Sequence, residues 1–179
     1  MADAKSQPRE WYDLGIVAQD AWVVVLRDLV RFPSGACGGY IRTLNRRSQV
    51  EQSGKDVVVL VSVDDKYLLM KHFRHDDRQW HWECPRGFGE AGLTPAENAE
   101  KEVMEETGLQ LLELRQLNSE HENIAYFHAR CAGSAENHDD DEAIEKFVLA
   151  DSSSVDRMLA DGRISDPYTL RALVLSRLQ

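Results

Sequence analysis

The stretch that decides the fold is residues 87–109, which read GFGEAGLTPAENAEKEVMEETGL. Its local signals describe one helix with clear ends. Thr94 is a good N-cap, Pro95 suits the first helical position, and Glu97 completes a capping box. Gly108 ends the helix, because glycine readily adopts the left-handed conformation that follows a last turn. The pattern therefore predicts a helix between these two ends, preceded by a glycine-containing loop.

Glu102, Glu105 and Glu106 stand at positions i, i+3 and i+4 of this helix. Such spacing projects their carboxylates from one face, within reach of one another. Three neighbouring charges repel one another, and a divalent cation removes that repulsion. All-oxygen ligation favours Mg²⁺ or Mn²⁺ over zinc or copper. Taken alone, the same pattern also fits a solvated helix face with salt partners such as Lys101.

Residues 87–109 resemble the Nudix box, whose pattern is G-x5-E-x7-R-E-U-x-E-E-x-G-U with U an aliphatic residue. Seven of the nine defined positions are in register: Gly87, Glu102, Val103, Glu105, Glu106, Gly108 and Leu109. Two positions depart from it, because Leu93 stands at the first glutamate and Lys101 at the arginine. In the family these two positions help to orient the metal-binding glutamates, so Glu90 or Glu97 is a candidate substitute.

The resemblance implies an α+β fold, an α/β/α sandwich in which a mixed β-sheet lies between helices. Residues 57–63 form a continuous apolar run, as expected for a strand buried on both faces, and residues 67–73 are its return strand. Asp166 is a predicted N-cap for the last helix. The further predicted strands are 80–84, 111–117, 124–131 and 145–149, and the last helices are 154–160 and 167–178.

The N-terminal part of the sequence is typical of a separate β module. Residues 21–32 and 40–44 are predicted strands with Gly and Pro between them, and a polar connection follows. We expect residues 1–50 to form a tail with this module and residues 51–179 to form the Nudix domain. A β unit of this size cannot bury its apolar face alone, so we expect it to mediate a homodimer.

The resemblance implies metal ligation by Glu102 and Glu106, supported by Glu105 and by the backbone carbonyl of Arg86. Mg²⁺ is the expected ion, with Mn²⁺ as a substitute. Glu105 and Glu106 are thereby candidate catalytic residues. Glu142, in an acidic loop after the later strands, is the candidate general base. A solvated loop explains that residue equally well.

Three further side chains are candidates for substrate binding. Arg74 could contact a phosphate, or could equally be a salt-bridge partner. Trp82 could stack on a nucleobase, although a tryptophan there is more often part of the core. Tyr126 could do the same, but it lies in the apolar run 124–127, where packing is the better explanation.

Outside the box, the sequence is similar to the branch that acts on ADP-ribose and nucleoside diphosphate sugars. Residues 56–74, 82–87 and 158–173 carry this similarity. It implies a hydrolase of the substrate diphosphate, with water attacking phosphorus. A proline that this branch often carries is missing near Ala125. Tyr126 keeps a dinucleoside polyphosphate hydrolase open as an alternative, and Leu93 with Lys101 keeps open a weakened nucleotide-binding module.

Composition limits the partners of the protein. The net charge is −10, from 31 acidic and 21 basic residues, and this field repels nucleic acid polymers. A small phosphorylated substrate stays possible because a metal ion reverses the local charge. No apolar run is long enough to span a bilayer, so we expect no membrane partner. Cys37, Cys84 and Cys131 have no disulfide or metal spacing, which favours a reducing, cytoplasmic location.

Overall fold

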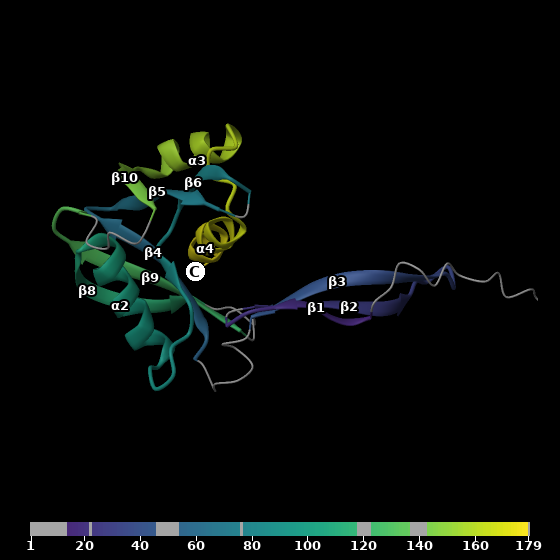
Figure 1. The fold of residues 1–179 in the computed structure, drawn as a ribbon. Helices are drawn as coiled ribbons and strands as arrows, with labels where there is room; N and C mark the ends of the chain where they lie inside the picture. Colours follow the sequence, from purple (N-terminus) through teal and green to yellow (C-terminus); the bar gives the residue numbers. More distant parts are fainter. Residues whose placement is uncertain are drawn as a thin grey trace, which may run out of the picture. The chain divides into compact units, whose positions relative to one another are not determined.

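The computed structural model of the 179-residue chain describes residues 14–21, 23–45, 54–75, 77–117, 123–136 and 143–178. The chain divides into two units, one up to residue 53 and one from residue 54 onward. Figure 1 labels the helices and strands of both units. The second unit contains the stretch that resembles the Nudix box.

The first unit is a three-stranded antiparallel sheet in the order β1-β2-β3. Its strands are β1 (Gly15–Gln19), β2 (Val23–Arg31) and β3 (Cys37–Asn45). The register between β2 and β3 runs unshifted from Val23 opposite Asn45 to Arg31 opposite Cys37. Gly35 lies in the connecting turn at φ +84°, a conformation that favours glycine. This part of the chain is thus a small β module, with β1 as a strand that the sequence did not indicate.

The second unit is built on a seven-stranded mixed sheet. Its main path is β10-β5-β4-β9-β8, while β6 pairs with β5 and β7 pairs with β4. β4 and β9 run parallel, and the other pairs are antiparallel. The strands are β4 (Asp56–Val63), β5 (Lys66–Arg74), β6 (Gln79–Glu83), β7 (Arg86–Gly87), β8 (Gln110–Leu117), β9 (Ile124–Ala132) and β10 (Ile144–Ala150).

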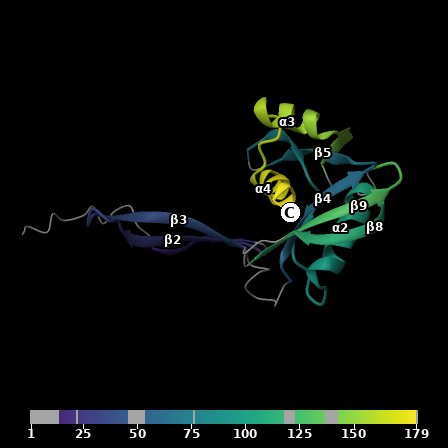
Figure 2. The same ribbon diagram turned by 180° about the vertical axis from the view of Figure 1, so that it is seen from behind.

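Helices cover both faces of this sheet. They are α2 (Pro95–Thr107), α3 (Ser152–Ala160) and α4 (Pro167–Arg177). α2 lies on one side, and α3 and α4 lie on the other, as Figures 1 and 2 show from opposite directions. The expected α+β fold, an α/β/α sandwich, is therefore confirmed.

β4 lies at the centre of the core, because its apolar side chains belong to two hydrophobic clusters, one on each face of the sheet. Val57, Val59 and Val61 belong to the cluster that also contains Ala99 and Val103 of α2. The alternate residues of β4 belong to the cluster on the other face: Val58 and Leu60 with Val155 and Met158 of α3 and Ala172 and Leu173 of α4. The alternation follows from the two-residue period of a strand. The prediction of a strand buried on both faces is confirmed.

No helix among the described residues is long and apolar enough to cross a membrane.

Candidate active site

α2 begins and ends as its sequence predicts. Thr94 is the N-cap, and its side-chain oxygen accepts a hydrogen bond from the Glu97 amide at 3.3 Å. The Glu97 carboxylate accepts from the Thr94 amide at 2.8 Å, which completes the capping box. The helix ends at Gly108, whose φ is 64° and whose N–H donates to the carbonyl of Met104 at 2.8 Å. These ends fix which residues of α2 face the sheet.

The loop before α2 needs its glycines because other groups lie against them. A Cβ atom on Gly87 would lie 1.8 Å from Oε1 of Glu102, so the glutamate carboxylate occupies the space of a side chain. A Cβ on Gly89 would lie 1.7 Å from the carbonyl oxygen of Gly54. The Gly89 N–H donates to Asp56 Oδ1 at 2.9 Å. Burial raises the pKa of Asp56, and this hydrogen bond opposes the rise.

Glu102 and Glu106 converge on the same short piece of backbone. Glu106 is 4% exposed, and its Oε2 accepts a hydrogen bond from the Arg86 N–H at 3.1 Å. Glu102 lies one helical turn earlier, with its carboxylate against Gly87. α2 therefore presents two carboxylates to neighbouring residues of one segment: Glu106 to the Arg86 N–H and Glu102 to the Cα of Gly87.

Glu105 has a different environment. Its side chain is 48% exposed, and its Oε2 lies 2.9 Å from Nζ of Lys101. The same ammonium group lies 2.6 Å from Oε1 of Glu90. The hydrogen bonds to Glu90 and Glu105 raise the pKa of Lys101. Of the two candidate substitutes for the glutamate missing at position 93, Glu90 is the one that contacts Lys101, whereas Glu97 serves the helix cap.

These positions determine how well a metal ion fits. The three-carboxylate group expected from the helix spacing is not formed: among the residues that the structure describes, no three His, Cys, Asp or Glu side chains are grouped to hold one metal ion. The helix spacing is right, but the Glu105 side chain turns to Lys101. Glu102 and Glu106 offer oxygen donors, the kind that hard divalent cations favour, and they lie against the adjacent residues Gly87 and Arg86. Ligation by the Arg86 carbonyl stays a prediction.

A network of charged side chains lies next to this point. Glu83 is 1% exposed, and both its oxygens accept hydrogen bonds from Nε of Arg74, at 3.0 and 2.9 Å. Nη2 of Arg74 also contacts it. Nη2 of Arg86 lies 3.5 Å from Glu83, and its Nη1 donates to Asp166 Oδ1 at 3.1 Å. The two guanidinium groups thus pair with Glu83 and Asp166.

The remaining predicted site residues lie in different surroundings. Tyr126 is 2% exposed in the core cluster below α3 and α4, and Trp82 packs half-buried against the same cluster. Arg74 is engaged with Glu83. Substrate contacts of these three residues stay predictions. Glu142 falls outside the described residues, and its role as a base also stays a prediction.

A family model for the NUDIX domain matches residues 53–172 of the chain. The chain belongs to the Nudix family. A crystal structure of an ADP compounds hydrolase superposes with a TM-score of 0.69 at 19% sequence identity, and the match covers 90% of this chain and 88% of that one. At that identity the likeness shows the fold alone. A search of curated proteins found no match. The predicted family and the predicted enzyme class, a hydrolase, are confirmed.

Sequence reasoning missed three buried polar residues of the Nudix domain: Glu83, Asp166 as a partner of Arg86, and Thr169. Asp166 was predicted only as an N-cap, which it is. Its contact with Arg86 joins residues 80 positions apart, and no local pattern marks such a contact. Glu83 had no distinguishing signal either, because Asp76, Asp77 and Arg78 also lie between Arg74 and Arg86 in the sequence.

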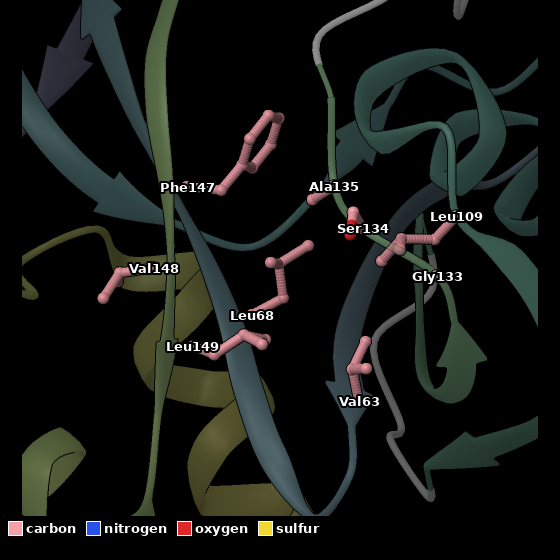
Figure 3. A pocket seen from close by; sticks show the side chains of 9 residues that line it. All are labelled: Val63, Leu68, Leu109, Gly133, Ser134, Ala135, Phe147, Val148 and Leu149. Atoms are coloured by element: carbon pink, nitrogen blue, oxygen red, sulfur yellow. The ribbon is translucent and has the colours of Figure 1, made fainter.

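An apolar cavity of about 240 Å³ lies elsewhere in the Nudix domain (Figure 3). It contains none of the predicted metal-binding or substrate-binding residues. Among the described residues that line it, none carries a charge, so they offer no charged group for a diphosphate or a metal ion. Its lining consists of Val63, Leu68, Leu109, Gly133, Ser134, Ala135, Phe147, Val148 and Leu149.

Proposed function

We propose that this Nudix hydrolase cuts the diphosphate of ADP-ribose or of a similar nucleoside diphosphate sugar, in a reaction that depends on Mg²⁺. Water adds to one phosphorus atom, and the bridging P–O bond breaks. With ADP-ribose the products are AMP and ribose 5-phosphate. Mn²⁺ is the expected substitute for Mg²⁺, because both ions favour oxygen ligands.

The observation that carries this proposal is the convergence of Glu106 and Glu102 on adjacent residues, Glu106 on the Arg86 N–H and Glu102 on Gly87. Glu102, Glu106 and the Arg86 carbonyl are the groups that would hold the ion. Once bound, it neutralises charge on the diphosphate and lowers the pKa of a bound water. Arg74 and Arg86 are already paired with Glu83 and Asp166, so they do not substitute for the cation.

The substrate class is supported by two likenesses. The first is the resemblance of residues 56–74, 82–87 and 158–173 to the branch that acts on ADP-ribose. The second is the likeness of fold to a protein described as an ADP compounds hydrolase. The net charge of −10 favours a small substrate whose charge a metal ion balances, over a nucleic acid polymer. Glu142 remains our proposed general base.

We also propose a reducing, cytoplasmic location. No disulfide joins Cys37, Cys84 or Cys131, all of which lie among the described residues, and reduced cysteines are usual in the cytosol.

The test compares the wild-type protein with Glu106→Gln in an assay of ADP-ribose with Mg²⁺, reading both products. We expect Glu106→Gln to lower kcat/KM by about 100-fold or more, because even groups beyond the ligands change metal affinity or activity by about 10-fold to 100-fold. Glu100→Gln is the matched control, since Glu100 is an exposed residue of the same helix. It should leave turnover unchanged.

A substrate panel with Mg²⁺ or Mn²⁺ separates this proposal from its competitors. Equal turnover by wild type and Glu106→Gln would reject the assigned site. If the protein hydrolysed only dinucleoside polyphosphates, these would replace nucleoside diphosphate sugars as the proposed substrate class. Nucleotide binding by calorimetry without hydrolysis of any panel member would leave only a binding module.

A further inference from the structure

The N-terminus of α4 contacts the segment that carries the proposed metal site. Asp166 is the N-cap of α4, and its Oδ2 accepts from the Thr169 N–H and from the Thr169 hydroxyl, each at 2.7 Å. Its other oxygen, Oδ1, accepts from Nη1 of Arg86 at 3.1 Å. Asp166 is 6% exposed, so both contacts are shielded from water. One carboxylate therefore caps a helix and binds the arginine next to the site.

Thr169 makes the second contact between α4 and this segment. Its Oγ1 accepts a hydrogen bond from the Cys84 N–H at 3.0 Å, and both residues are 0% exposed. The hydroxyl donates its own hydrogen to Asp166. The backbone at Cys84 and the side chain of Arg86 are thus held from the same helix end, two residues apart in the sequence.

The held segment leads directly to Glu106. The Arg86 N–H donates to Oε2 of Glu106 at 3.1 Å. On the sheet side, the carbonyl of Pro85 accepts from the Val59 N–H at 2.9 Å. The Arg86 guanidinium is also packed over the ring of Tyr168, 4.7 Å from its centroid. The peptide that joins Pro85 to Arg86 is therefore held by β4 and by α2, and the Arg86 side chain is held by α4.

We propose that Asp166 and Thr169 are positioning residues of the metal site: they hold the segment 84–86 so that the Arg86 N–H meets Glu106, a proposed ligand of the ion. This inference rests on the proposed function. Groups that orient metal ligands commonly change metal affinity by about 10-fold to 100-fold when they are removed. If Asp166 served only as the N-cap of α4, replacing it by another good N-cap residue would leave the metal affinity unchanged.

Asp166→Asn separates the two roles, because asparagine is also a good N-cap but carries no charge for Arg86. Asp151→Asn is the matched control. Asp151 caps α3 in the same way, accepting from the Ser154 N–H at 2.7 Å. We expect Asp166→Asn to weaken Mn²⁺ binding, measured by calorimetry and by electron paramagnetic resonance of free Mn²⁺, by about 10-fold. Asp151→Asn should bind as wild type does.

Two further variants protect the test against simple misfolding. Arg86→Met keeps the backbone carbonyl but removes the contact with Asp166, and it should weaken Mn²⁺ binding to a similar extent. Arg86→Lys keeps the charge and should recover part of the affinity. Thermal unfolding identifies variants that do not fold. Wild-type Mn²⁺ affinity in folded Asp166→Asn and Arg86→Met would overturn the inference.

Amide hydrogen exchange tests the positioning without any metal. We expect faster exchange at the Cys84 and Arg86 amides in Asp166→Asn, and no change there in Asp151→Asn. Should the wild type bind no Mn²⁺, the proposed metal site fails, and with it the functional part of this inference. Unchanged exchange at Arg86 would overturn the positioning even if the wild type binds Mn²⁺ and hydrolyses its substrate.

Discussion

His72 is a buried titratable residue in the second unit, on β5. It is 5% exposed, and its pKa is lowered to about 4, first by burial and then by the charges of Arg74 and Arg86. The folded protein therefore resists protonation of this ring. An unfolded chain takes up the proton near the ordinary pKa of 6.5. The contribution of the neutral His72 ring to the free energy of unfolding is present above pH 6.5. It is lost as the pH drops toward 4, because the unfolded state then binds more protons than the folded state.

We expect this histidine to cost about 2 kcal/mol of unfolding free energy between pH 7 and pH 5. Urea unfolding at the two pH values measures it in wild type and in His72→Leu. The pH-dependent loss should be smaller in the variant by that amount. His75→Asn is the control, an exposed histidine three residues away, and it should change the slope less than His72→Leu does. Equal slopes in wild type and His72→Leu would show that the buried ring is not responsible.

At the scale of elements, the ends of α2 could be predicted from the sequence, whereas the contacts of its charged side chains were harder to predict. Lys101 neutralises Glu90 and Glu105 on the side of the helix where the Nudix pattern has an arginine. The side chains involved are 38–48% exposed, so each ion pair contributes at most about 1 kcal/mol. Replacing Lys101 should therefore change the free energy of unfolding little. In the wild type, the lysine forms an ion pair with the Glu105 carboxylate.

We predict that Lys101→Met tightens Mn²⁺ binding by about twofold to fivefold, a change that corresponds to the energy of one exposed ion pair. The substitution removes a positive charge near the proposed site and breaks the ion pair with Glu105. Calorimetry with Mn²⁺ checks this. Lys101→Arg keeps the charge and serves as the control, with affinity near that of wild type. Weaker binding in Lys101→Met would mean that the lysine holds Glu105 in a productive position.

The same helix shows how far sequence reasoning reaches. Caps depend on neighbours within three or four residues, so Thr94 and Gly108 could be predicted from the sequence. Helical spacing could place Glu102, Glu105 and Glu106 on one side and name Lys101 as a salt partner, but it could not say which glutamates the lysine would contact. That choice depends on side-chain rotamers and on a loop residue, Glu90.

Side-chain contacts between elements that are distant in the sequence could not be predicted from local sequence patterns. The contact between Arg86 and Asp166 joins β7 to the start of α4, 80 residues further along the chain, and neither residue carries a pattern that indicates the other. The run 57–63 was different, because continuous apolarity is itself the signal of a doubly buried strand. Sequence therefore predicted the frame of the second unit and named the glutamates of the proposed site, but it did not indicate the contacts of Asp166 and Thr169.

At the scale of the whole molecule, the first unit leaves apolar surface uncovered. Among the described residues, seven of the fifteen exposed large apolar side chains belong to residues 14–45. Ile16 and Tyr40 are 60% and 58% exposed. Ile16 pairs with Leu26, and Tyr40 pairs with Asp28, so both side chains lie on one face of the sheet. A three-stranded sheet needs a covered apolar face to be stable in water.

We therefore predict a homodimer in which a second copy of the chain covers this face. Sedimentation velocity at micromolar concentration should show a dimer for wild type and a monomer for Ile16→Lys/Tyr40→Lys, because two lysines place unpaired charges in the interface. Leu112→Lys is the matched control: Leu112 is 56% exposed on β8 of the second unit, and the variant should stay dimeric. A wild-type protein that sediments as a monomer at these concentrations would contradict the prediction. Its exposed sheet face would then need a different partner.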